Sequence, residues 1–145
     1  MHVRTEWQGK RLFEAVPPSG HRVKMDVSPA AGGDGSAPTP LELVLVGLTG
    51  CMGVDVVMIL EKMRLKVDAV RLEADAQRRE DPPKAITHVQ LTVYIDGDIP
   101  PRHAWRAVYL SLSKYCSVAH SLRATITPRL VLNGTEVPET TNSET

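Results

Sequence analysis

The sequence predicts one α+β domain, and three patterns lead to this prediction. Short segments that alternate between apolar and polar residues fill the first third of the chain, and a long apolar segment follows them. Further alternating segments and a second helical pattern make up the rest. Alternation at a period of two is typical of half-buried strands, whereas apolar residues at steps of three and four are typical of helices. Because this order of elements does not require parallel βαβ units, the α+β class is favoured over α/β.

Three strands are predicted near the N-terminus, at residues 3–7, 12–16 and 21–27. The turn signals Gln-Gly-Lys and Pro-Pro-Ser-Gly separate them, so the three strands are expected to form a meander. Residues 28–39 are rich in Ala, Gly, Ser and Pro and have no periodicity, which predicts a loop.

A long central helix is predicted over residues 41–64. Thr39 and Pro40 match an N-cap followed by a proline at the first helical position. The segment is apolar on most sides until its last turn, which is typical of a helix covered all round. A chain of 145 residues offers little surface for that, so a partner subunit is expected. Glu42 and Asp55 would be costly in hydrocarbon, which favours a core helix over a membrane span.

The second half of the chain predicts two strands, a second helix and a last strand. Their ranges are residues 67–79, 86–96, 102–119 and 125–132. The complete order is β-β-β-α-β-β-α-β, in a single domain that covers residues 1–132. Residues 133–145 are polar, and we expect them to form a disordered tail.

Composition excludes two classes of partner. The chain carries 17 Lys and Arg against 17 Asp and Glu, and only 4% of its residues are aromatic. A neutral chain has no electrostatic basis for binding nucleic acid or an anionic membrane. The first residues contain no apolar signal-peptide segment, so a cytoplasmic protein is expected.

Cys51 and Cys116 are the two cysteines, and each lies on an apolar part of a predicted helix. One interpretation is structural, because free cysteine is often buried as a small hydrophobic residue. The other is chemical, because in a reducing compartment the two would be free thiols or a catalytic pair. Gly50 and Gly53 would open space beside Cys51 for a substrate or a second sulfur. Asp55 lies one helical turn from Cys51 and would raise its pKa if it faced the sulfur.

Glu42 precedes Cys51 by nine residues, which is about 900° of helical rotation and half a turn out of phase. In a regular helix Glu42 therefore cannot face its own Cys51, although it could face the site of a neighbouring subunit. The simpler interpretation is a first-turn acid that interacts favourably with the helix N-terminus. Both interpretations stay open.

Two segments of the sequence resemble the OsmC/Ohr family of osmotically inducible and organic-hydroperoxide-resistance proteins. The first runs from Pro38 to Cys51, with its Pro-x-Glu-Leu start and a cysteine nine positions after the Glu. The second is Lys114-Tyr-Cys116-Ser-Val-Ala. Residues 55–62 and 114–119 look more narrowly like the YhfA-type branch. The likeness extends over nearly the whole chain, up to about Leu132.

The resemblance implies an OsmC-like fold, an intertwined homodimer with sites at the subunit interface, and a thiol peroxidase without metal or haem. Cys51 would be the peroxidatic thiolate, and Cys116 would resolve its sulfenic acid as a disulfide. An external dithiol would then reduce the pair. Glu42 would correspond to the acid that orients an arginine beside the reactive sulfur.

The sequence departs from the family at this arginine. Thiolate chemistry on a peroxide needs a nearby cation, yet residues 28–39 contain no Arg or Lys. Arg11 is the nearest candidate by position, and Arg22 is the next. Arg78 and Arg79, on the fourth predicted strand, are further candidates.

Two other functions are compatible with the sequence. The first is a binding or redox-sensing protein of the same fold, whose interface pocket holds a small ligand and turns nothing over. The second is a zinc site formed by Cys51, Cys116 and His120, the last being four residues after Cys116.

Overall fold

The computed structural model describes residues 1–140 of the chain. It divides into two compact units, Met1–Val46 and Gly47–Thr145, which are described one at a time below.

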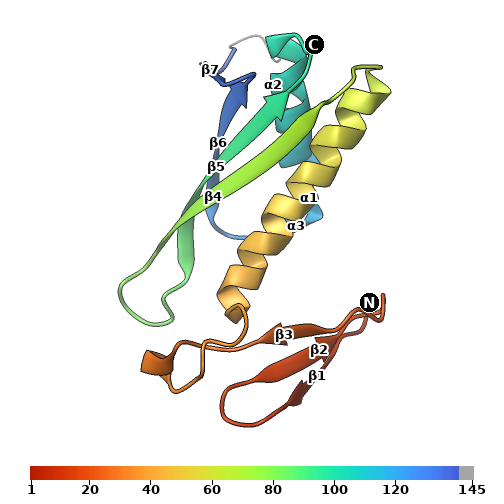
Figure 1. Cartoon of the computed structure of the whole chain (residues 1–145). Coiled ribbons are helices and arrows are strands. Elements are labelled where there is room, and N and C mark those ends of the chain that lie inside the picture. The colour runs from red at the N-terminus through yellow and green to blue at the C-terminus, as the bar shows by residue number, and fades with distance from the viewer. Residues whose placement is uncertain (141–145) are drawn as a thin grey trace. The chain divides into compact units, whose positions relative to one another are not determined.

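The N-terminal unit contains a three-stranded antiparallel sheet in the order β1-β2-β3 (Figure 1). The strands are β1 (Arg4–Trp7), β2 (Phe13–Val16) and β3 (Val23–Met25). The predicted meander is therefore confirmed. Gly9 adopts a φ of 104° in the first turn, a backbone conformation that favours glycine.

The loop after β3 is fixed by one buried carboxylate. Asp26 is 2% exposed and accepts hydrogen bonds from the backbone N–H groups of Val27 and Asp34. Ser36 donates two more, from its hydroxyl at 2.7 Å and its backbone N–H at 3.1 Å. These bonds, with the Ser36 hydroxyl the largest contribution, lower the pKa of Asp26 to about 2. The loop holds one short 3₁₀ helix, η1 (Pro29–Ala31).

Helix α1 (Pro40–Lys62) begins in the N-terminal unit and continues into the C-terminal one. Its start is a capping box. The Glu42 backbone N–H donates to Thr39 Oγ1, and the Thr39 backbone N–H donates to Glu42 Oε2 at 2.8 Å. The predicted cap at Thr39 is therefore confirmed.

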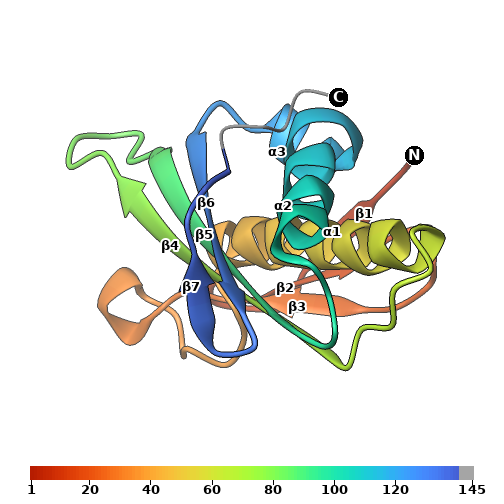
Figure 2. The same cartoon turned by 90° about the horizontal axis from the view of Figure 1, so that it is seen from above.

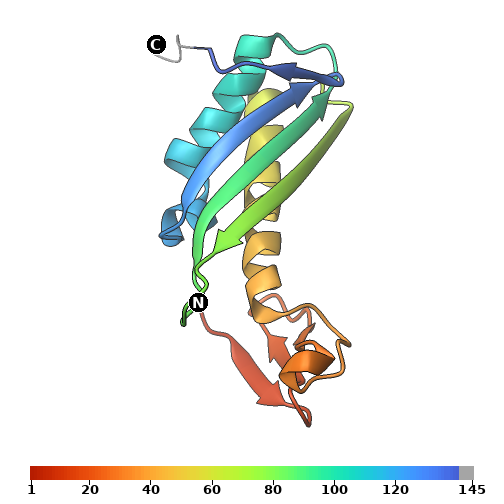
Figure 3. The same cartoon turned by 90° about the vertical axis from the view of Figure 1, so that its left-hand side faces the viewer.

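The C-terminal unit is a four-stranded sheet with helices on one face (Figures 2 and 3). Its strands are β4 (Ala69–Arg78), β5 (Ile86–Asp96), β6 (Thr125–Leu132) and β7 (Thr135–Val137). Strands β4 and β5 pair antiparallel, β5 and β6 parallel, and β6 and β7 antiparallel. Helix α2 (Pro101–Leu110) lies between β5 and β6 in the chain. The core lies between the sheet and these helices and includes Leu60, Val93, Val108 and Leu130.

Strand β7 corrects the prediction of a disordered tail from residue 133. Asn133 and Gly134 form a tight turn with φ values of 49° and 80°, after which Thr135 pairs with Leu132. An Asn-Gly pair is a strong hairpin signal, because both residues tolerate positive φ. The polar composition of residues 133–145 favoured a disordered tail and outweighed this hairpin signal in the prediction. Residues 141–145 of the predicted tail lie outside the described residues.

The predicted second helix over residues 102–119 is also wrong as a single element. It consists of α2, a π-helical turn η2 (Ser111–Tyr115) and a short helix α3 (Ser117–Ser121). Cys116 stands between the last two in an extended conformation, with φ of −71° and ψ of 99°.

Helix α1 is not covered on all sides within one chain. Its buried side includes Leu48, Met52 and Val56, whereas Val54 is 59% exposed and Met58 is 48% exposed. Within the described residues α1 is also the one helix long and apolar enough to cross a membrane. The core helix of a soluble protein passes the same test, so this is weak evidence for a span.

Candidate functional site

The two cysteines meet in the C-terminal unit. Cys51 lies on α1, and Cys116 is the residue that caps α3. The Sγ atoms of Cys51 and Cys116 and a carboxylate oxygen of Asp55 all lie within 4.8 Å of one another. Both thiols are free, and Cys116 is fully buried whereas Cys51 is partly exposed. A reagent from solvent can therefore reach Cys51 first.

The interruption of the helix between η2 and α3 determines the position of the Cys116 thiol. The π-helical turn ends with the Cys116 backbone N–H donating to the Ser111 carbonyl oxygen at 2.7 Å. Such turns are rare and are often found at functional sites. Once Cys116 is extended, its Sγ accepts a hydrogen bond from the Ala119 backbone N–H at 3.3 Å. The position of the Cys116 thiol is thus fixed by a hydrogen bond from α3 as well as by apolar packing.

The pKa of Cys51 is lowered from its ordinary value. Burial raises it, but hydrogen bonds from the Val118 backbone N–H, the Cys116 thiol and the Ser117 hydroxyl outweigh this cost. Cys51 Sγ and Ser117 Oγ lie 4.0 Å apart. All three donors stabilise the thiolate, which is the nucleophilic form of cysteine.

The pKa of Cys116 is raised to about 11, mainly by burial. The neighbouring Cys51 and Asp55 raise it further, because a second negative charge beside them is unfavourable. The hydrogen bond from Ala119 only partly opposes these effects. At neutral pH Cys116 is therefore protonated, and its thiol donates a hydrogen bond to Cys51 Sγ.

Asp55 is the charged group beside the two thiols. Its Oδ2 atom accepts a hydrogen bond of 2.8 Å from Ser111 Oγ, and Ser111 is fully buried. Its charge raises the pKa of Cys51, as its position one turn along the helix predicted.

Gly53 has a packing role that the sequence did not indicate. A Cβ atom there would lie 3.1 Å from Leu72 Cδ1 on β4, so glycine lets α1 approach the sheet closely. Around Gly50, in contrast, no heavy atom among the described residues would lie within 4 Å of such a Cβ, as predicted for open space.

Glu42 and the candidate arginines in the hairpin lie in the N-terminal unit, where each has a local contact. Glu42 belongs to the capping box of α1. Arg11 donates to the Lys10 carbonyl oxygen at 3.3 Å and lies against Gly32. Their predicted roles beside the reactive sulfur stay predictions.

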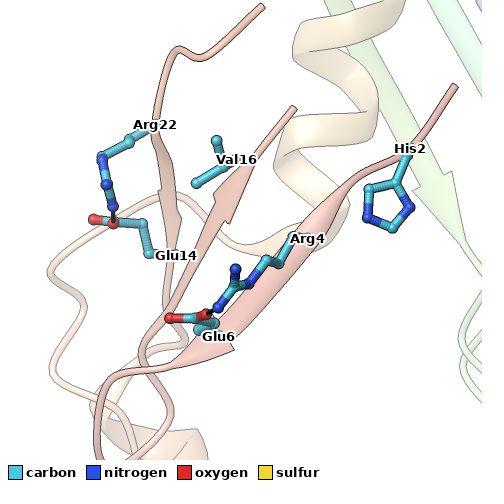
Figure 4. A pocket seen from close by; sticks show the side chains of 6 residues that line it. All are labelled: His2, Arg4, Glu6, Glu14, Val16 and Arg22. Carbon is cyan, nitrogen blue, oxygen red and sulfur yellow. Dashed lines mark hydrogen bonds and ion pairs between the residues drawn. The ribbon is translucent and has the colours of Figure 1, made fainter. Parts of the chain in front are cut away.

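Arg22, directly before β3, pairs with Glu14 on β2 at 2.5 Å (Figure 4). The two line a cleft of about 410 Å³ in the N-terminal unit, where Arg4 and Glu6 form another ion pair. The charges in this cleft therefore neutralise one another in pairs. On β4, the side chain of Arg78 donates to the Lys84 carbonyl oxygen at 2.8 Å.

Three side chains could hold a metal ion, and they differ from the set weighed in the sequence. Among the described residues the group consists of Cys51, Asp55 and Cys116. His120 is exposed and is not part of it.

The fold and the thiol pair define a two-cysteine protein with an OsmC-like architecture. The family model described as OsmC-like protein matches residues 33–131. The chain therefore belongs to the OsmC/Ohr family, and, like other members of this family, it is a soluble protein.

One relative and two solved structures are similar to this chain. Protein YhfA of Escherichia coli K12 is 38% identical over 127 residues, which are 87% of this chain and 92% of YhfA. The structure of a hypothetical protein from Aquifex aeolicus VF5 is 26% identical, with a TM-score of 0.80 over 90% of this chain and 94% of that one. An organic hydroperoxide resistance protein OsmC from Legionella pneumophila has a TM-score of 0.64 over 91% of this chain and 96% of that one. Its identity of 14% shows a shared fold alone.

Proposed function

We propose that this protein reduces organic hydroperoxides, with Cys51 as the peroxidatic cysteine and Cys116 as the resolving cysteine. The observation that carries this proposal is that the pKa values of these two neighbouring thiols are shifted in opposite directions. The pKa of Cys51 is lowered and that of Cys116 is raised to about 11. Cys51 is thus the thiol that loses its proton more readily and can attack, whereas Cys116 stays protonated and donates a hydrogen bond to it.

The first step forms a bond between Cys51 Sγ and the terminal oxygen of the hydroperoxide. The O–O bond breaks, the leaving alkoxide takes up a proton to give the alcohol, and Cys51 becomes a sulfenic acid. In the second step the Cys116 sulfur, after losing its proton, attacks Cys51 Sγ. A disulfide forms, and the sulfenic oxygen leaves as water. An external dithiol then reduces the disulfide, and no bound cofactor takes part.

A cleft lined in part by Asp55, the acid next to the two thiols, supports an organic substrate. It has a volume of about 430 Å³, and its lining residues come mainly from α1 and α2. Its apolar lining is provided by Met58, Ile59, Met63, Leu110 and Tyr115, and Lys62 and Arg106 line it as well. Apolar walls favour an alkyl or aryl hydroperoxide over hydrogen peroxide. The structurally similar Legionella pneumophila protein is named an organic hydroperoxide resistance protein, which agrees with this substrate class.

The proposal includes a homodimer in the cytoplasm, in which Glu42 and Arg11 complete the site. The exposed apolar residues Val54 and Met58 on α1 support a subunit contact. A Val54→Asp variant should run as a monomer in light scattering after gel filtration, whereas Arg79→Asp, on the exposed end of the β4–β5 hairpin, should leave the dimer intact. A monomeric wild-type protein would contradict this part.

Rapid mixing of the reduced protein with cumene hydroperoxide tests the chemistry. Two thiols per chain should be lost in one stoichiometric addition, with one disulfide and one equivalent of alcohol formed. Cys51→Ser should keep its one remaining thiol. Cys116→Ser should still lose its one thiol to a sulfenic acid, which a dimedone adduct detects by mass. If Cys51 stayed reduced in excess peroxide, the proposal would be wrong.

A second candidate is a ligand-binding or redox-sensing protein of the same fold. The observation in its favour is the Asp55 carboxylate, because it opposes the thiolate that a fast peroxidase needs. The two candidates differ in turnover. A sensor would form the disulfide once but would show no sustained consumption of peroxide with thioredoxin or dihydrolipoamide as the reductant.

A further inference from the structure

We propose that the reduced protein binds one zinc ion per chain through Cys51 Sγ, Cys116 Sγ and a carboxylate oxygen of Asp55. The site uses the two cysteines of the proposed peroxidase chemistry, although that chemistry itself needs no metal. The bound ion would hold both thiols in a state that cannot react with peroxide.

The positions of the three ligand atoms carry the proposal. They lie within 4.8 Å of one another and come from two elements, with Cys51 and Asp55 on α1 and Cys116 before α3. Zinc–sulfur bonds of about 2.3 Å and zinc–oxygen bonds of about 2.0 Å place the ligand atoms of a tetrahedral ion about 3.5–3.8 Å apart. The three atoms would therefore need to approach by about 1.3 Å at most, which small side-chain rotations can supply.

The surrounding hydrogen bonds already orient these ligands. Ser111 Oγ donates to Asp55 Oδ2 at 2.8 Å, and the Ala119 backbone N–H donates to Cys116 Sγ at 3.3 Å. The Val118 backbone N–H donates to Cys51 Sγ. Each of the three ligands thus has at least one hydrogen-bond donor that orients it, as is usual for metal ligands in proteins.

The donor set favours zinc over the abundant hard cations. Thiolate ligands suit zinc and softer ions, whereas calcium and magnesium require mainly oxygen ligands. The fourth position of the ion would be open to water, because Cys51 is partly exposed. A divalent cation would also relieve the repulsion between the Asp55 carboxylate and the Cys51 thiolate.

Binding has a chemical consequence that can be measured. The ion would use the lone pairs of both sulfurs, so neither thiolate could attack a peroxide. Binding would also release the protons of the thiols that become ligands. Peroxide-dependent thiol loss should therefore slow when zinc is added and recover when a chelator removes it.

The test is a titration of the full reduced protein, without peroxide, against a chromophoric zinc chelator under anaerobic conditions. We expect one equivalent of zinc per chain. Cys51→Ser and Cys116→Ser should each weaken binding by more than the roughly 10–100-fold typical of an outer hydrogen-bond partner. Asp55→Asn should weaken it about tenfold or more, and Ser111→Ala by about 10–100-fold.

His120→Ala is the matched control, because His120 is the histidine nearest in sequence to the site and should leave the affinity unchanged. Cadmium in place of zinc should give a thiolate charge-transfer band in the wild type that is lost in both Cys→Ser variants. Thermal melts of each variant without metal show whether it is still folded, and so distinguish the loss of a zinc ligand from the loss of the fold. The proposal is overturned if the wild type binds no more tightly than the Cys→Ser variants, or if His120→Ala weakens binding as they do. A peroxidase that failed to bind zinc would leave the proposed function standing.

Discussion

The sulfurs of Cys51 and Cys116 lie within 4.8 Å of each other, yet the pKa values of the two thiols are displaced in opposite directions. The difference has a structural cause. Cys51 accepts hydrogen bonds from the start of α3, whereas Cys116 is fully buried and donates to Cys51. A negative charge on Cys51 makes a second one on Cys116 unfavourable, so the pair favours a single thiolate.

The first prediction concerns the pH dependence of alkylation by iodoacetamide. Because the thiolate is the reacting form, the rate for each cysteine rises as the pH rises through its pKa. Cys51 should be alkylated with a midpoint below the ordinary thiol value of 9.0, and Cys116 with a midpoint near 11. Mass spectrometry of peptides from quenched samples assigns each midpoint. Equal midpoints for the two residues would contradict the division of roles.

The second prediction concerns the charge of Asp55. Removing it in Asp55→Asn should lower the pKa of Cys51 further, because the carboxylate raises that pKa in the wild type. Alkylation of Cys51 at pH 6 should then be several-fold faster. Asp75→Asn, an exposed acid on β4, is the matched control and should not change the rate. A slower reaction of Asp55→Asn would show that Asp55 supports the thiolate in another way.

Local signals in the sequence were sufficient for much of the fold. Periodicity and the turn residues around Gly9 predicted the N-terminal meander, and Thr39 with Pro40 predicted the start of α1. These features depend on neighbours in the chain, so they can be read without the tertiary structure.

The position of Cys116 could not be read in this way. The apolar residues from Trp105 to Ala119 keep helical spacing across the break, so the periodicity predicts one continuous helix. The break involves Ser111, whose carbonyl accepts from Cys116 and whose hydroxyl donates to Asp55 on α1. Such contacts between distant segments have no signal in the local pattern. The pairing of the two thiols depends on the same packing, and so do the donors Ser117 and Val118.

The third prediction concerns the core of the C-terminal unit. Leu60 on α1 is fully buried against the sheet and α2. Leu60→Ala should therefore lower the free energy of unfolding by about 2–5 kcal/mol, through lost apolar burial and the cavity that remains. Glu61→Ala, at the next and exposed position, should change it by less than about 0.5 kcal/mol. Urea unfolding followed by circular dichroism measures both variants, and similar values for the two would contradict this packing of α1.

The fourth prediction concerns Asp26 and the loop that it fixes. Its pKa is lowered from 3.8 to about 2 in the folded chain, mainly by the hydroxyl of Ser36. A lowered pKa stabilises the fold at pH values above 3.8, and this contribution is lost as the pH falls through about 2. At neutral pH the charged form is fully present, so Asp26→Asn should remove the contribution there.

The measurement is limited proteolysis of residues 27–37 at pH 7, where the loop should be cut faster in Asp26→Asn than in the wild type. Asp34→Asn is the matched control, because the Asp34 side chain is 59% exposed and pairs with Lys10 at the surface. An exposed pair of this kind contributes little to stability, so the control should be cut at the wild-type rate. Because Ser36 provides two of the hydrogen bonds to Asp26, Ser36→Ala should show a smaller change in the same direction. If Asp34→Asn opened the loop as much as Asp26→Asn, the Lys10 ion pair rather than the buried carboxylate would hold it.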